Sequence, residues 1–271
     1  MVKRLINKQK PSNLVQSIER TASILDVLGQ YPNGLSLGDL SEQVCLPKGT
    51  THRLLTSMVY FDFVRQNHIN KYYHLGFKLV ELGNNLLSHI DLRNEAHPLL
   101  IKLGEKIHET IHLVILDNEE ALYIDKVNMS SQRGGLQMVS RLGSRIPLYC
   151  SAVGKVLLAF MSEPAATVII QNTNFKQLAR NTITSKEELA IYLETVRALG
   201  YAFDDEENEE GVRCIAAPIR DESGQVVAAM SVSVPASRMS INEMNKLLKS
   251  QVVETANNIS HRLGFVKLRH Q

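Results

Sequence analysis

The chain has 271 residues, a length that favours two domains over one, and its 44% hydrophobic and 21% charged residues exclude a largely disordered protein. It contains no run of about 20 apolar residues that could span a membrane, and no apolar signal segment follows its basic start. We therefore expect a cytoplasmic protein with no membrane partner.

The formal charge of +2 conceals an asymmetry along the chain. Residues 1–80 carry ten Lys or Arg and five Asp or Glu, a balance of +5, whereas the remainder carries 20 and 23, a balance of −3. This favours a nucleic-acid partner for the first segment and not for the second. The three cysteines, Cys45, Cys150 and Cys214, are widely spaced and odd in number, so reduced thiols are expected.

Two helices are predicted near the start of the chain. Apolar residues recur at helical spacing over roughly 14–30 and end at the turn Tyr31-Pro32-Asn33-Gly34. Ser36 can then cap a short second helix, in which Leu37, Leu40 and Val44 share one face.

A third helix is predicted to begin at Pro47, which suits a first helical turn. Two short helices joined by a tight turn match a helix-turn-helix, whose second helix can reach base edges and phosphates. Residues 63–66 and 72–75 then bracket a polar tip and indicate a β-hairpin wing. The candidate DNA-contacting residues are Ser36, Lys48, Thr50, Thr51, His52, Arg53, Ser57 and, on the wing, Lys71.

The second half of the chain alternates between strand and helix periods. A linker helix is predicted over 76–90, with Pro98 near the start of the next helix. Strands are predicted at 111–117, 121–127, 214–220 and 226–234, and helices at 151–161, 164–171, 186–199 and 240–264. This irregular order indicates an α+β fold on a mainly antiparallel sheet. The predicted domains are a winged helix-turn-helix over 13–75, the linker over 76–90, and a second domain over 91–266.

Several longer motifs resemble one family of bacterial regulators. The segment from Leu35 to Leu55 is similar to the DNA-binding core of the IclR family, and three stretches are similar to its effector domain: 140–155, with Ser140-Arg141-Leu142-Gly143 and Pro147–Lys155; Arg180-Asn181-Thr182-Ile183-Thr184; and 204–218. The resemblance covers residues 13–266. It implies a winged helix-turn-helix, a linker helix, and a GAF-like effector and oligomerisation domain.

Within that family, residues 180–184 and 206–211 look most like the branch that represses pectin-breakdown genes and senses 2-keto-3-deoxygluconate. One departure is Gly49, where relatives usually carry a hydroxyl residue. The glycine removes a possible phosphate contact and loosens the recognition helix.

The resemblance also implies an effector site for a small anionic metabolite, such as a keto or sugar acid. Its residues would be Ala152 and Val153 through their backbone N–H groups, the side chains of Asp204, Cys214, Ser231 and Ser233, and apolar walls from 138–142. Physical chemistry supports this independently, because unpaired N–H groups at a helix start favour a carboxylate. Two serines two residues apart in a strand also face the same side.

Plainer interpretations stay open for these residues. Ser231 and Ser233 could form a solvated strand face, and Cys214 could be a packed small residue. The acidic run over 204–210 is typical of a solvated loop, from which only Asp204 is retained as a candidate. His52 and Arg53 could be exposed helix residues with no ligand.

The remaining alternatives concern the class of protein. Cys150 and Cys214 could in principle be nucleophiles, but the chain lacks the usual catalytic and nucleotide-binding motifs, so no enzyme activity and no cofactor is expected. His108 and His112 are four apart, yet the strand-like run at 111–116 speaks against a metal site. A sensor acting through protein contacts without DNA is the other alternative. The expected partners are double-stranded palindromic operator DNA, the metabolite, and further copies of the chain as a dimer or dimer of dimers.

Overall fold

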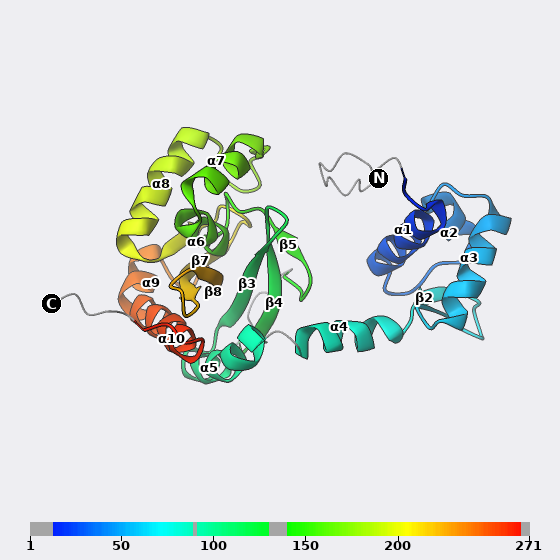
Figure 1. The fold of residues 1–271 in the computed structure, drawn as a ribbon, viewed down its shortest axis with the longest axis horizontal. Helices are drawn as coiled ribbons and strands as arrows, with labels where there is room; N and C mark the ends of the chain where they lie inside the picture. The colour runs from blue at the N-terminus through cyan, green and yellow to red at the C-terminus, as the bar shows by residue number, and fades with distance from the viewer. Residues whose placement is uncertain (1–12, 89–90, 130–139, 267–271) are drawn as a thin grey trace. The chain divides into compact units, whose positions relative to one another are not determined.

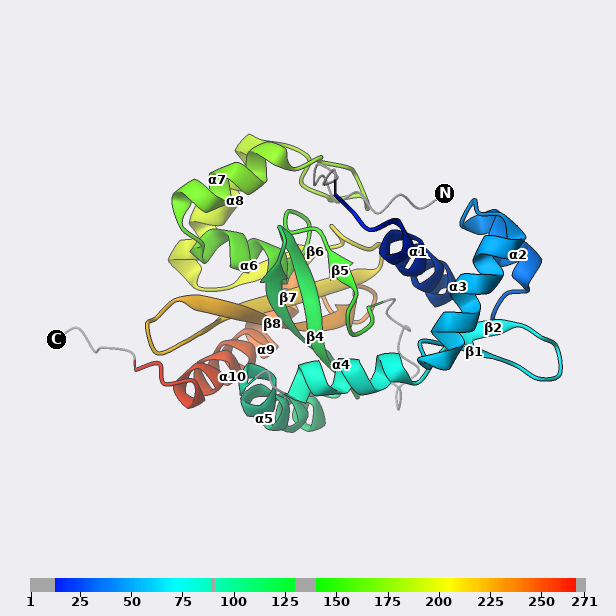
Figure 2. The same cartoon turned by 45° about the vertical axis from the view of Figure 1, so that its right-hand side comes forward.

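The computed structural model describes residues 13–88, 91–129 and 140–266, and it divides the chain into two compact units, residues 1–89 and 90–271. Each unit is described by itself. Figures 1 and 2 show the two units in views that differ by a turn about the vertical axis.

The first unit is a winged helix-turn-helix (Figure 1). Ser36 caps the second helix as expected, with its Oγ accepting a hydrogen bond from the Asp39 N–H at 3.2 Å. The wing is wider than expected, because Leu35 and Tyr73 exchange two backbone hydrogen bonds beside it. The elements are α1 (Gln16–Gln30), α2 (Leu37–Gln43), α3 (Lys48–Tyr60), β1 (Val64–Gln66), β2 (Tyr73–Leu75) and α4 (Lys78–Ser88).

The second unit is built on a six-stranded sheet in the order β5-β4-β3-β8-β7-β6, in which every neighbouring pair is antiparallel. The α+β prediction is therefore confirmed. The strands are β3 (Thr110–Asp117), β4 (Glu120–Asn128), β5 (Arg145–Ile146), β6 (Ala202–Asp205), β7 (Val212–Arg220) and β8 (Val226–Pro235).

Helices cover both faces of this sheet (Figures 1 and 2). One layer contains α6 (Ala152–Phe160), α7 (Glu163–Asn172) and α8 (Lys186–Leu199), and the other contains α5 (Asp91–Ile107), α9 (Ile241–Leu247) and α10 (Lys249–Arg262). Strand β8 shows how the sequence separates the layers. Its even-numbered residues from Ala228 to Val234 enter the core beneath α5 and α10, whereas Ser231 and Ser233 face the α6 side.

Three details differ from the sequence-based expectations. Pro98 lies inside α5 and not near its start, on an exposed side of the helix. The closing helix is interrupted at Leu248, where α9 ends and α10 begins. The short strands β5 and β6 were not predicted, and β6 includes Asp204 and Asp205 from the acidic run that was expected to be a loop.

None of the helices in the described ranges combines the length and the apolar character that crossing a membrane requires.

Candidate functional site

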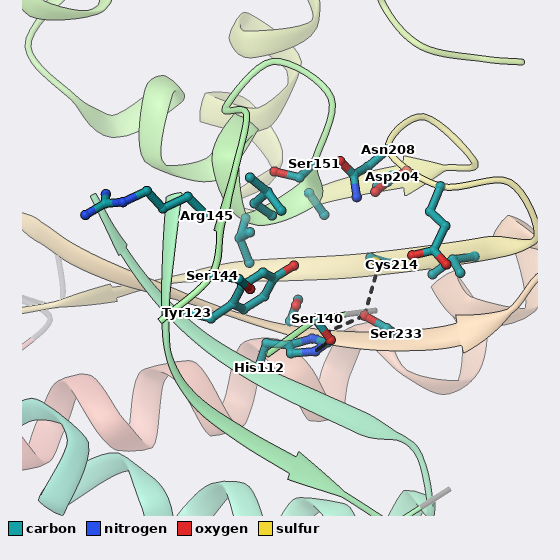
Figure 3. A pocket seen from close by; sticks show the side chains of 16 residues that line it. His112, Tyr123, Ser140, Ser144, Arg145, Ser151, Asp204, Asn208, Cys214 and Ser233 are labelled. Carbon is teal, nitrogen blue, oxygen red and sulfur yellow. Dashed lines mark hydrogen bonds between the residues drawn. The ribbon is translucent and has the colours of Figure 1, made fainter. Parts of the chain in front are cut away.

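A cavity of about 350 Å³ opens on the α6 side of the sheet (Figure 3). A volume of this order suits a small metabolite. The cavity brings together the six residues proposed for effector binding: Ala152, Val153, Asp204, Cys214, Ser231 and Ser233. Of the proposed apolar walls, residues 138 and 139 lie outside the described residues, and Ser140 contributes to the lining.

Strand register explains how residues so distant in sequence converge. Asp204 pairs with Cys214, Cys214 with Ser233, and Ser233 with Thr110, so these four residues form one row across β6, β7, β8 and β3. Directly opposed side chains lie on the same face of a sheet and contact one another. The Cys214 Sγ and Ser233 Oγ atoms are accordingly 3.0 Å apart.

A second row runs beside the first and contains a residue that sequence reasoning missed. His112 on β3 pairs with Ser231 on β8, and its imidazole is 3% exposed. Its Nδ1 lies 3.4 Å from Ser233 Oγ and its Nε2 lies 2.8 Å from Ser140 Oγ (Figure 3). Its ring also packs on Tyr123, with centroids 4.9 Å apart.

The N-terminus of α6 forms the opposite wall. Ser151 is the N-cap, and its Oγ accepts from the Gly154 N–H at 3.2 Å. The N–H groups of Ala152 and Val153 are the first two of the helix and have no intrahelical acceptor. Both residues line the cavity. Gly154 is required here, because a Cβ atom would lie 2.4 Å from the Leu148 carbonyl oxygen.

Charge near the cavity is balanced by a buried lysine. Burial raises the pKa of Asp204 to about 7, although Lys155 and the Glu207 N–H, which donates to Asp204 Oδ1 at 2.8 Å, both favour the carboxylate. Lys155 is completely buried, forms an ion pair with Glu207, and lies 4.4 Å from the centre of the Tyr192 ring. Asp204 can therefore bind a ligand either as a neutral acid or as a carboxylate.

The row of groups from Cys214 to Ser140 is uncharged. Burial, with a smaller effect from the Lys126 ammonium, lowers the pKa of His112 to about 3, so its imidazole is neutral at physiological pH. Burial raises the pKa of the Cys214 thiol and raises that of Cys150 to about 12. Both thiols therefore stay protonated, which argues against a cysteine nucleophile because the thiolate is the reactive form.

Sequence reasoning missed further residues of the lining: Tyr123, Ser144, Arg145, Ile146, Ser151, Asn208, Glu209 and Val212, besides His112. The sequence of β3 does contain a signal, because His112 is the one polar residue within the apolar run from Ile111 to Leu116. Only the pairing of β3 with β8 converts that signal into a position beside Ser231. No group of three or more His, Cys, Asp or Glu within the described ranges is arranged to hold a metal ion.

The candidate DNA-binding helix is α3, and most of its proposed contact residues are exposed: Lys48, His52, Arg53 and Ser57, with Thr50 half-buried. Thr51 is an exception and corrects the expectation. It is fully buried, and its Oγ1 donates to the Pro47 carbonyl at 3.2 Å, so it is unable to reach a base or a phosphate. Ser36 is half-buried, and its hydroxyl is engaged in capping α2.

The wing tip is an ordered loop. The Asn67 N–H donates to the Tyr72 carbonyl at 2.8 Å, and the Lys71 N–H donates to the Asn67 carbonyl at 2.9 Å. Lys71 has a φ of 61°, a left-handed conformation, and its side chain is exposed. The loop thus presents Lys71 on the same unit as the exposed residues of α3.

Comparisons with known proteins agree with this geometry. Residues 17–68 match the family model described as the IclR helix-turn-helix domain, and residues 84–261 match the model described as bacterial transcriptional regulator IclR C-terminal. The chain belongs to the IclR family and is a DNA-binding transcriptional regulator.

Individual relatives match over nearly their whole length. The transcriptional regulator XynR of Escherichia coli is 35% identical over 254 residues, covering 93% of this chain and 98% of XynR, and KdgR of the same organism is 36% identical over 260 residues, covering 96% of each. The crystal structure of Thermotoga maritima IclR has a TM-score of 0.79 at 32% identity, covering 92% of this chain and 99% of the other.

Proposed function

We propose that this regulator represses its target genes and responds to a small keto or sugar acid, with 2-keto-3-deoxygluconate as the leading candidate. The observation that carries the proposal is the convergence, in one cavity, of a helix start whose first two N–H groups have no intrahelical acceptor and a row of hydroxyl and carboxyl groups. The likeness to KdgR, including 36% identity over 260 residues, supports the choice of ligand.

The helix start provides the acceptor site for the ligand's carboxylate. The N–H groups of Ala152 and Val153 can donate to it, and the dipole of α6 adds to the attraction.

The opposite wall suits the hydroxyl groups of a sugar acid. Asp204 can accept a hydrogen bond from a ligand hydroxyl, and Ser231 and Ser233 can each donate or accept. A polyhydroxylated acid therefore satisfies both walls, whereas a simple fatty acid would leave the buried polar groups on the sheet without partners.

For DNA, we propose that α3 enters the major groove and that Lys48, Thr50, His52, Arg53 and Ser57 provide the contacts, with Lys71 on the wing holding the phosphate backbone. Ser36 remains a candidate for a phosphate contact through its backbone. A homo-oligomer, as a dimer or dimer of dimers, would place two such helices on a palindromic operator. Effector binding then has to favour one arrangement of the oligomer over another.

The test is binding of the purified protein to DNA from upstream of its own gene, measured at several salt concentrations with and without 2-keto-3-deoxygluconate. We expect specific, salt-sensitive binding that the ligand weakens. Binding that is indifferent to this ligand would reject the ligand and retain the regulator. Replacing Asp204 with Asn should blunt the ligand response while leaving DNA binding unchanged, and Glu188→Gln, which alters an exposed carboxylate on α8, is the matched control.

A further inference from the structure

We infer that His112 is a specificity-determining residue, which makes the pocket reject a ligand that presents hydrogen-bond acceptors to both Ser233 and Ser140. The inference rests on the proposed function, because it deepens the description of the ligand that the pocket binds.

The geometry is a continuous chain of hydrogen-bonding groups. It runs from Cys214 Sγ to Ser233 Oγ at 3.0 Å, from Ser233 Oγ to His112 Nδ1 at 3.4 Å, and from His112 Nε2 to Ser140 Oγ at 2.8 Å. All four residues line the cavity (Figure 3). A ligand can therefore reach both serines that flank His112, Ser233 and Ser140.

A neutral imidazole has one N–H and one lone pair, and this limits the chain to two complete arrangements. In the first, Nε2–H donates to Ser140 Oγ, and Nδ1 accepts from the Ser233 hydroxyl. The Ser140 hydroxyl hydrogen is then free to donate to the ligand, and Ser233 Oγ can accept from it. In the second arrangement every donor and acceptor is reversed.

In either arrangement one serine donates to the ligand and the other accepts from it. Two acceptors on the ligand would require both serines to donate, and both ring nitrogens would then have to carry protons for the chain to stay intact. Burial of His112 and the nearby Lys126 ammonium oppose that charged form. Two donors on the ligand are compatible with a neutral ring, because each serine oxygen has two lone pairs, so the chain discriminates only against paired acceptors.

The ligand class follows from this requirement. A hydroxy-keto or hydroxy-carboxylate group presents one donor and one acceptor, whereas the two carboxylates of a diacid present only acceptors at neutral pH. The Lys126 Nζ atom donates to the Ser140 carbonyl at 2.6 Å and so holds the Ser140 end of the chain in place.

The experiment is titration calorimetry with two probes of equal carbon number: 2-keto-3-deoxygluconate, which has hydroxyl groups, and 2-oxoadipate, a keto diacid without them. We expect the wild-type protein to prefer the hydroxylated probe by at least about tenfold, the effect of one lost hydrogen bond. His112→Phe, which retains an aromatic ring against Tyr123, should reduce that preference.

A double-mutant cycle tests the coupling directly. Ser140→Ala and Ser233→Ala should have non-additive effects on the affinity for 2-keto-3-deoxygluconate, and the effects should become additive in the His112→Phe background. Ser144→Ala is the matched control, because Ser144 lines the same cavity but its hydroxyl donates to the Arg141 carbonyl. Additive serine effects in the wild-type background, or an unchanged preference in His112→Phe, would overturn the inference.

A ligand-free measurement separates this inference from the proposed function. In ¹⁵N NMR spectra of the intact protein at neutral pH, His112 should show one protonated and one unprotonated ring nitrogen. If the wild-type protein binds neither probe, the proposed ligand class fails. An imidazolium in the spectrum would overturn the inference whatever the ligand is.

Discussion

Lys155 on α6 and Glu207, which follows β6, form an ion pair that is almost completely shielded from solvent, beside the Asp204 wall of the cavity. The pair joins the two elements that provide the opposite walls of the pocket. The Glu207 carbonyl also accepts a hydrogen bond from Thr182 Oγ1 at 2.5 Å, so the 179–183 segment is fixed to the same point.

Removing the lysine should therefore destabilise the protein strongly. Lys155→Met leaves the Glu207 carboxylate buried without its partner, and we expect a loss of about 3–5 kcal/mol in the free energy of unfolding, measured by urea denaturation at fixed protein concentration. Lys155→Met combined with Glu207→Leu should recover much of that loss. The control is Lys78→Met, which removes an exposed lysine from an ion pair with Glu81 and should have little effect.

Stability should also depend on pH through Asp204. Its pKa is raised from 3.8 to about 7 by burial, so the folded state holds a proton that the unfolded state releases, and stability falls as the pH rises through this interval. Asp204→Asn is neutral throughout and lacks this decline. Its melting temperature relative to wild type should therefore increase between about pH 4 and pH 7. A difference that is constant with pH would show that the carboxyl is not buried as described.

Local chemistry sufficed to predict most of the fold. The Ser36 cap, the turn at 31–34 and the hairpin bracketing 68–71 are short-range features, and the structure contains each of them. The break at Leu248 and the position of Pro98 inside α5 are decided by tertiary packing, because apolar periodicity continues through both. The two-residue strand β5 is too short to show a period and exists only through its pairing with β4.

The pocket was predictable only in part, for the same reason. Motif resemblance pointed to Asp204, Cys214 and the two serines without any knowledge of strand order, and the strand register then explains why they lie together. His112 belongs to the pocket because β3 pairs with β8 as well as with β4, the strand that follows it in the chain. Thr51 failed in the opposite sense: His52 and Arg53, which follow it, are exposed, but Thr51 itself lies on the side of α3 that packs against the core.

Two helical glycines offer a matched test of the geometry. A Cβ atom on Gly154 would lie 2.4 Å from the Leu148 carbonyl oxygen, whereas nothing lies within 4 Å of the corresponding position on Gly49. Gly154→Ala should therefore cost about 1–3 kcal/mol through overpacking, and Gly49→Ala should be neutral or stabilise by up to about 1 kcal/mol through helix propensity. Thermal unfolding of both variants checks the difference, and equal effects would contradict the close approach of α6 to residue 148.

The DNA contact of α3 can be tested by comparing variants of an exposed residue, Arg53, and of a buried residue two positions before it, Thr51. Arg53 is exposed, and Thr51 is buried with its hydroxyl bonded to Pro47. If Arg53 binds a phosphate, Arg53→Ala should weaken binding to all DNA sequences and reduce the slope of log affinity against log salt by about 0.9. If it reads a guanine, the variant should instead lose discrimination at one base pair. Thr51→Val, the control, should leave the salt slope unchanged whatever it does to stability. A change in the slope for Thr51→Val together with none for Arg53→Ala would mean that a different face of α3 meets the DNA.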